Sequence, residues 1–172
     1  MATRSLIKGD LLAHQTATIA GVVASLGAVT ALQRFKQRQG PFLLLAASIG
    51  VALKLSRFRS KTLQNMAASH WPGPVTLVFS ARKGLPAACY HRGTIAVRVD
   101  ASPEVRCLAK EMGGVIVSSS LNRRKRATLP ANRNTHLRLS RWLNGRIKSS
   151  HKGSGKASAI FLIKGKKIKK LR

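Results

Sequence analysis

The chain has 172 residues, 44% of them hydrophobic, so it is long enough and apolar enough to fold around a core, and disorder throughout is excluded. Its 32 Lys and Arg residues stand against only four acids, Asp10, Asp100, Glu104 and Glu111, which gives a formal net charge of +28. Few carboxylates are therefore present for general-base or metal chemistry, and so strong a positive field repels itself unless a polyanion neutralises it.

The first third of the chain predicts two strands and a helix. Residues 11–33 carry no Lys, Arg, Asp or Glu, but their polar side chains make a membrane span a poor explanation and favour a strand followed by a helix. GVVAS at 21–25 predicts the strand, and residues 28–38 predict the helix. FLLLAAS at 42–48 is wholly apolar, which is typical of a strand buried on both faces.

The segment VALKLSRFRSKTLQNMAA at 51–68 has helical spacing. Its apolar side chains Leu53, Leu55, Phe58 and Leu63 fall on one side, and basic side chains fall on the other. The segment therefore predicts one continuous helix.

Strands and one well-marked helix follow in the next part of the chain. PVTLVFS at 74–80 and TIAVRVD at 94–100 predict two strands. In SPEVRCLAKEMGG, Ser102 can cap a helix and Pro103 suits its first position. GVIVSS at 114–119 predicts the strand after it, so strands alternate with helices, and we expect an α/β fold with a twisted mixed sheet and flanking helices.

Composition divides the chain into three parts. We expect the core of the α/β domain over residues 1–122, a basic loop-rich segment over 123–157, and a last strand with a basic tail over 158–172. Within the second part, KGSGKAS at 152–158 lacks the first glycine and the Ser or Thr of a complete P-loop. It therefore predicts a flexible basic loop.

Positive charge is concentrated toward the carboxyl end. Residues 121–172 hold 17 Lys and Arg and no acid, whereas residues 1–120 hold 15 Lys and Arg and all four acids. Charge of one sign over a third of the chain indicates a phosphate-bearing partner, because a merely solvated surface mixes signs. A membrane is a poorer partner, since the basic region lacks the apolar face of an interfacial helix.

Several segments resemble the YrdC-like family of threonylcarbamoyl-adenylate synthases. The resemblance rests on HWPGPVTLVF, GTIAVRVD and GVIVSSSLN, on a K-x-R element within FKQRQGPFLLLAAS, and on the closing strand. It implies a YrdC-like α/β sheet with a basic cleft, where ATP, threonine and bicarbonate meet in the first step of a tRNA base modification. The nucleotide-side residues that it implies are Lys36, Arg38, Arg98, Ser118, Ser120, Asn122 and Ser158.

The sequence also departs from that family. The Y-P-T-E-x-x-Y-G-L segment, which helps to build the amino-acid pocket, is absent, because GVVAS runs directly into LGAVTALQRFKQR. RRKR replaces the Ser-Gly pair after S-x-N, QGPF replaces a lysine after K-x-R, and Leu162 replaces an acidic residue. A site without its amino-acid pocket cannot gain rate by orienting that substrate. We therefore expect a pseudoenzyme with no catalytic residue, no metal and no cofactor, or with ATP if the enzyme hypothesis holds.

The leading hypothesis from the sequence is a structural RNA-binding protein. It would be a ribosomal component, mitochondrial rather than cytoplasmic, that contacts ribosomal RNA phosphates beside neighbouring ribosomal proteins and without a membrane. The alternatives are an active or divergent threonylcarbamoyl-adenylate synthase in tRNA modification, or a ribosome-maturation factor. The side chains expected to bind RNA are Arg123, Arg124, Lys125, Arg126, Arg133, Arg138, Arg141, Arg146, Lys148, Lys152, Lys164, Lys166, Lys167, Lys169, Lys170 and Arg172.

Overall fold

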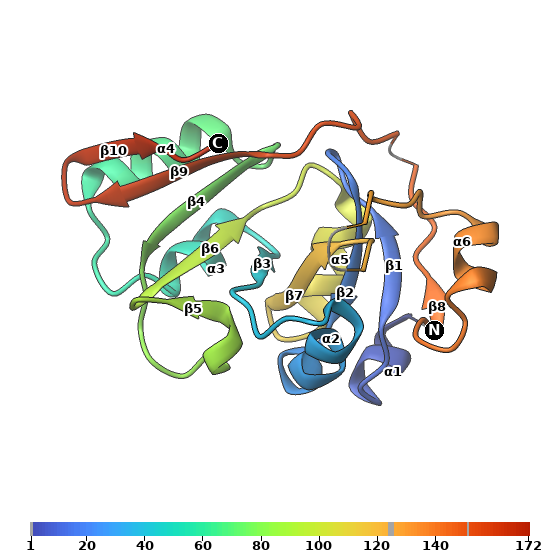
Figure 1. Cartoon of the computed structure of the whole chain (residues 1–172). Helices are drawn as coiled ribbons and strands as arrows, with labels where there is room; N and C mark the ends of the chain where they lie inside the picture. Colours follow the sequence, from blue (N-terminus) through green and yellow to red (C-terminus); the bar gives the residue numbers. More distant parts are fainter. Residues whose placement is uncertain (1, 124–125, 151) are drawn as a thin grey trace.

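One mixed sheet organises the structure, a computed structural model that describes residues 2–123, 126–150 and 152–172 (Figure 1). Nine of its ten strands follow the order β10-β9-β4-β6-β3-β7-β2-β1-β8, and the tenth, β5, pairs with β6 beside this path. The strands are β1 (Leu12–Gln15), β2 (Ala20–Ala24), β3 (Leu43–Ala46), β4 (Val75–Ser80), β5 (Tyr90–His91), β6 (Thr94–Arg98), β7 (Val115–Ser120), β8 (Gly145–Arg146), β9 (Ala159–Lys164) and β10 (Lys167–Lys170).

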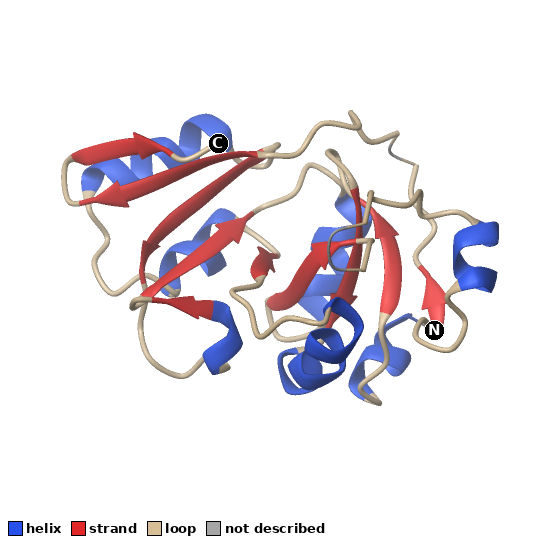
Figure 2. Ribbon diagram, in the orientation of Figure 1, coloured by secondary structure: helices blue, strands red, loops and turns tan. Residues whose placement is uncertain are grey.

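Helices flank this sheet, so the predicted α/β fold with a mixed sheet is confirmed. Figure 2 shows them against the strands, and packing contacts join α5 to β3 and β7, and α4 to β4. The α-helices are α1 (Ala2–Ile7), α2 (Val29–Lys36), α3 (Ile49–Lys54), α4 (Lys61–His70), α5 (Pro103–Glu111) and α6 (Arg133–Arg138), with 3-10 turns η1 (Leu26–Ala28) and η2 (Ala87–Cys89).

Strand β3 lies in the middle of the core, as its apolar run predicts. It pairs in parallel with β6 and antiparallel with β7. Leu44 belongs to the core cluster that contains Leu32 and Phe35 of α2, whereas Leu45 belongs to the cluster that contains Leu108 of α5. Alternate residues thus face opposite sides of the sheet, and both sides are covered.

The helix predicted after GTIAVRVD is also confirmed. The Ser102 Oγ accepts a hydrogen bond from the Val105 N–H, and Pro103 is the first residue of α5. Gly113, at φ +82°, follows the helix end, in a conformation that side chains other than glycine's rarely adopt. A local cap and stop signal therefore placed this helix from sequence alone.

The single helix expected over residues 51–68 is wrong. The chain there forms α3 and α4 with an irregular connection, in which Ser56 makes an isolated β-bridge with Ala81. The Ser60 Oγ then accepts from the Leu63 N–H and starts α4 as a separate helix. Phe58, which the helical spacing placed with the core, lies in the connection and is 65% exposed. A long-range strand contact and a second cap overrode the local spacing.

The carboxyl-terminal third contains more regular structure than expected. The residues predicted as a basic tail form β10, which pairs antiparallel with β9, and β9 pairs in parallel with β4. Within the segment predicted as loops, α6 forms and β8 pairs with β1. Residues Lys167–Lys170 therefore add an edge strand to the sheet that the sequence did not predict.

The predicted loop over residues 152–158 contains no helix or strand, and backbone hydrogen bonds join it to the turn between β1 and β2. The Ser154 and Gly155 N–H groups donate to the Ala17 and Thr18 carbonyls in the turn between β1 and β2. At Gly153 an added Cβ would collide with the backbone carbonyl of Thr18, so this close approach needs glycine.

The uncharged stretch at 11–33 becomes β1, β2 and the first part of α2. Across the described ranges of the chain, no helix has both the length and the hydropathy needed to cross a membrane.

Candidate functional site

A cavity of about 450 Å³ lies on one face of the sheet, a size that suits a small-molecule ligand. Its walls come from β2, β4, β6, β7 and β9, from the turn between β1 and β2, and from the end of the chain. The lining residues are Thr16, Thr18, Ile19, Ala20, Gly21, Arg38, Pro41, Phe42, Leu43, Thr76, Val78, His91, Thr94, Ile95, Ala96, Arg98, Ser118, Ser119, Ser120, Ser158, Ile160, Leu171 and Arg172.

Sequence elements far apart in the chain meet at this cavity. Of the seven nucleotide-side residues predicted, five line it: Arg38, Arg98, Ser118, Ser120 and Ser158. The other two, Lys36 and Asn122, are not among the lining residues and are hydrogen-bonded to each other and to Ser120. The predicted K-x-R and S-x-N elements are therefore neighbours in space.

Lys36, at the end of α2, joins that helix to the end of β7. Its Nζ donates to the Ser120 carbonyl at 2.8 Å, the Ser120 Oγ at 3.3 Å and the Asn122 carbonyl at 2.5 Å, and also to the Asn122 Oδ1. Burial, with a smaller effect of the nearby Arg38 charge, lowers the pKa of Lys36 to about 8. An ammonium has three N–H donors, so protein oxygens take all of them here. Lys36 thus positions the strand end, where the sequence had suggested a phosphate contact.

Arg38 lies two residues beyond Lys36 and reaches the cavity. Its guanidinium lies over the Phe42 ring, with Cζ 4.7 Å from the ring centroid, and one of its N–H groups donates to the Ser119 Oγ at 3.4 Å. Partial burial lowers the pKa of this guanidinium. A guanidinium has five N–H donors, so several remain for a ligand.

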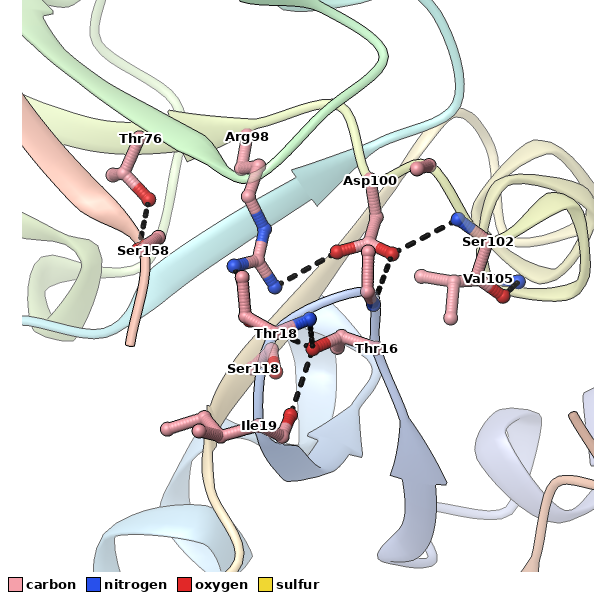
Figure 3. Close-up of polar contacts among 12 residues, drawn as sticks. Thr16, Thr18, Ile19, Thr76, Arg98, Asp100, Ser102, Val105, Ser118 and Ser158 are labelled. Carbon is pink, nitrogen blue, oxygen red and sulfur yellow. Dashed lines mark hydrogen bonds and ion pairs between the residues drawn. The ribbon is translucent and has the colours of Figure 1, made fainter. Parts of the chain in front are cut away.

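Arg98 and Asp100 form a buried ion pair at the end of β6 (Figure 3). Arg98 Nη2 is 2.9 Å from Asp100 Oδ2, and the two side chains are 4% and 0% exposed. Arg98 also donates to the Thr18 Oγ1 at 2.9 Å, and Asp100 accepts from the Ala17 and Ser102 N–H groups. The pair therefore fastens the turn between β1 and β2 to the start of α5, and the charge of Arg98 at the cavity wall is balanced.

Sequence reasoning missed several side chains of the cavity wall. Thr76 on β4 is 3.0 Å from Ser158, oxygen to oxygen (Figure 3), and Thr16 and Thr18 lie on the turn between β1 and β2. Arg172, expected to bind RNA, lines the cavity and donates from Nε to the Ser158 carbonyl at 3.1 Å. Thr76 lies within the HWPGPVTLVF segment that carries the family resemblance, whereas Thr16 and Thr18 lie in a stretch without a matched motif.

A buried histidine supports the floor of the cavity. His14 on β1 is fully buried, and its Nε2 lies 3.2 Å from the Ser118 Oγ. Its Nδ1 has no partner among the described residues. Burial lowers the pKa of His14 to about 4, against a smaller opposing effect of Asp100 and a lowering effect of Arg98. The ring is therefore neutral at physiological pH.

Among the described residues, no group of three or more His, Cys, Asp or Glu side chains is placed to hold a metal ion. Cys89 is buried, Cys107 is exposed, and both are free thiols. No Asp or Glu is among the residues that line the cavity. Its polar surface is thus made of hydroxyl, guanidinium and imidazole groups, a donor-rich set that suits an anion.

The side chains predicted to bind RNA do not form one surface. Those on α6 and β8 lie at one edge of the sheet, and those on β9 and β10 lie at the other, as Figure 1 shows. Arg123 is close to the first group, with its Cζ 5.5 Å from the centroid of the Trp142 ring. Arg124 and Lys125 lie outside the described residues, so their predicted role stays a prediction.

The family model Sua5_yciO_yrdC, described as "Telomere recombination", matches residues 4–172. A threonylcarbamoyl-AMP synthase of Idiomarina loihiensis is 34% identical over 129 residues, which cover 70% of this chain and 69% of that protein. A threonylcarbamoyl-AMP synthase of Nitrosococcus oceani is 32% identical over 130 residues, which cover 72% of this chain and 70% of that one. Sequence similarity therefore extends over most of the chain.

Two solved structures have the same fold. The crystal structure of P. abyssi Sua5 complexed with L-threonine superposes with a TM-score of 0.88 at 22% identity and covers 99% of this chain. Escherichia coli YciO superposes with a TM-score of 0.81 at 18% identity, covering 99% of this chain and 86% of that one. The match spans 52% of the Sua5 chain, so this chain corresponds to about half of that protein. The predicted YrdC-like fold is confirmed.

Proposed function

Because the chain belongs to the Sua5/YciO/YrdC family, we propose that its cavity binds an adenine nucleotide and that the protein works in threonylcarbamoyl-AMP synthesis as a divergent member. Relatives at about 30% identity carry the synthase name. The comparisons support this alternative more than the ribosomal hypothesis drawn from charge. The proposal thus differs from the expected pseudoenzyme, and activity is the property to be tested.

The observation that carries the nucleotide proposal is the meeting of K-x-R and S-x-N at the cavity. Lys36 holds Ser120 and Asn122, so the end of β7 has a defined position next to Arg38. Charge-assisted hydrogen bonds from a guanidinium are strong and suit phosphate geometry. Arg172 also lines the cavity and no Asp or Glu does, so the lining favours a polyphosphate.

This chain has fewer residues with which to bind the amino-acid substrate. Since GVVAS leads directly into α2, the segment that walls the threonine site in the resembled family has no counterpart. A substrate with fewer contacts is oriented less well, so we expect threonine to bind weakly compared with ATP.

The test of the proposed activity uses the purified full chain with ATP, bicarbonate and threonine. Pyrophosphate release that depends on threonine, with threonylcarbamoyl-AMP detected by mass spectrometry, is the expected result. ATP binding without any such product would overturn the synthase half of the proposal and leave a nucleotide-binding pseudoenzyme. Absence of ATP binding would overturn both halves.

Replacing Arg38 by Gln should raise the Kd for ATP about tenfold, because one charge-assisted contact to phosphate contributes about 1.5 kcal/mol. Isothermal titration calorimetry measures this effect. The matched control is Arg59→Gln, which removes an exposed arginine from the connection between α3 and α4, away from the cavity. Equal affinities of the two variants would contradict the assignment of Arg38 to the nucleotide site.

A second candidate function, binding of RNA, rests on the excess of Lys and Arg over acids in the carboxyl-terminal third. Membership of a ribosomal particle, in mitochondria or elsewhere, remains a prediction from that charge. Stoichiometric co-sedimentation with ribosomal subunits after a high-salt wash would support it. A protein that leaves the subunits in the wash would instead fit a maturation factor.

A further inference from the structure

Strand β10 has an open outer edge. It is the last strand of the sheet path and, in the part of the chain that the structure describes, it pairs with β9 alone (Figure 1). All four of its residues are exposed. Strand β8, at the opposite edge of the sheet, has two residues, so β10 offers the longer edge to another extended chain.

The backbone of β10 has unpaired groups that point outward at two residues. The Leu171 N–H, just after β10, donates to the Ile160 carbonyl of β9 at 2.8 Å. In an antiparallel ladder, residues that bond to the partner strand alternate with residues whose N–H and C=O point away from it. Lys167 and Lys169 therefore bond to β9, and the N–H and C=O groups of Ile168 and Lys170 point outward.

Strand pairing sorts the side chains of this edge by face. Lys167 lies opposite Lys164 and Lys169 lies opposite Leu162, so both lysines project to the same side of the sheet. Ile168 lies opposite Ile163 on the other side, and its side chain is 48% exposed. An added strand would thus meet a positive charge, an apolar side chain and a second positive charge in succession.

The charge of this edge is not compensated within the chain. Residues 164–172 hold six Lys and Arg and no Asp or Glu. Among the described residues, the ion pair between Arg98 and Asp100 is the one contact of a Lys or Arg with a carboxylate within salt-bridge distance. The lysines of β10 therefore present a positive field to any chain that pairs with the strand.

We propose that the outer edge of β10 binds an extended acidic segment of a partner protein as a further strand of the sheet. Its acidic side chains would lie opposite Lys167 and Lys169, and an apolar side chain would lie opposite Ile168, because directly opposite residues share a face. In this mode of recognition, main-chain hydrogen bonds give affinity and alternate side chains give selectivity. The proposal goes beyond the nucleotide proposal, since none of these three residues lines the cavity.

An acidic strand suits both the backbone and the side chains of this edge. A second copy of the chain, paired antiparallel with Ile168 opposite Ile168, would place Lys167 opposite Lys169, and like charges directly opposite each other are destabilising. A nucleic acid neutralises lysines but has no strand backbone to pair with the outward groups of Ile168 and Lys170. A segment in which acidic and apolar residues alternate meets all these features.

The experiment uses the full chain and a labelled synthetic peptide, GEVEVEG, in which glutamates alternate with valines. Fluorescence polarisation should show that it binds, and that the neutral peptide GQVQVQG binds about tenfold more weakly, because several exposed ion pairs are lost. The peptide GVVEEEG keeps the composition and charge without the alternation, and it should also bind about tenfold more weakly. Failure of GEVEVEG to bind, or equal binding of GVVEEEG, would overturn the proposal.

A pair of variants separates main-chain pairing from charge. Lys170→Pro removes the outward N–H of this residue together with its charge, whereas the matched control Lys170→Gln removes the charge alone. An edge strand tolerates proline where the N–H faces outward. Because one hydrogen bond is worth a factor of about five, GEVEVEG should bind about fivefold more weakly to Lys170→Pro than to Lys170→Gln. Equal affinities of the two variants would contradict pairing along this edge.

Amide exchange of the wild-type protein, followed by NMR, gives a readout that needs no variant. GEVEVEG should slow exchange at the outward N–H groups of Ile168 and Lys170, and exchange at Lys169, whose N–H bonds to β9, should change little. Protection at β8 in place of β10 would overturn the assignment of the edge. A single-stranded RNA that slowed the same two amides to the same extent would overturn an acidic peptide as the occupant.

Discussion

Replacing Lys36 by Met is expected to lower the free energy of unfolding by about 3 kcal/mol, because it leaves buried oxygens of Ser120 and Asn122 without a charged donor. Lys36 is 4% exposed, so water cannot take over these hydrogen bonds without opening the site. The end of β7 would lose its tie to α2, and ATP affinity should fall even though Lys36 does not line the cavity. Urea unfolding and calorimetric titration of ATP measure the two effects.

The control for this variant is Lys110→Met, which changes an exposed lysine on α5 in the same way. It should alter the free energy of unfolding by less than about 0.5 kcal/mol. If Lys36→Met were as stable as this control, the bonds to Ser120 and Asn122 would not contribute to the native state as described.

Acidification is expected to destabilise the protein through His14. Its pKa is about 4 in the folded chain and 6.5 when unperturbed, so the unfolded state binds more protons between these values. Stability is therefore highest above the unperturbed pKa and falls as the pH decreases through this window. A difference of this size in pKa corresponds to about 3 kcal/mol.

Urea unfolding across this pH range measures the loss, and His14→Gln is the informative variant. Glutamine has no titrating group, so the variant should lose the part of the pH dependence that lies between the two pKa values. Its stability at neutral pH can differ from wild type without affecting this comparison. A pH profile of His14→Gln that parallels wild type would contradict the buried neutral histidine.

Local signals predicted the elements that local interactions determine. The Ser102 cap placed α5, and the unbroken apolar run placed β3 between two core clusters. The resemblance placed five side chains of the cavity wall: Arg38 and Ser120 through K-x-R and S-x-N, and Arg98, Ser118 and Ser158 through the other matched segments.

The structural features that the sequence did not predict depend on pairing between residues far apart in the chain. The bridge between Ser56 and Ala81 interrupts a helix whose spacing looked continuous, and no local pattern reveals that contact. Lysine-rich β10 has low strand propensity but forms because Ile168 can pair with Ile163 on β9. Topology also separates the basic third, since β8 pairs with β1 whereas β9 pairs with β4.

Strand β10 is the outermost strand at its side of the sheet and is paired on one side, with β9. The backbone groups on its outer side are open to another extended chain, and lysines are the residues that commonly discourage such edge-to-edge association. The exposed Lys167, Lys169 and Lys170 of β10 therefore protect the solubility of the protein. If these lysines were replaced by neutral residues, β10 would be an edge strand that is open to pairing with another copy of the chain. Gel filtration would then show dimers and larger aggregates.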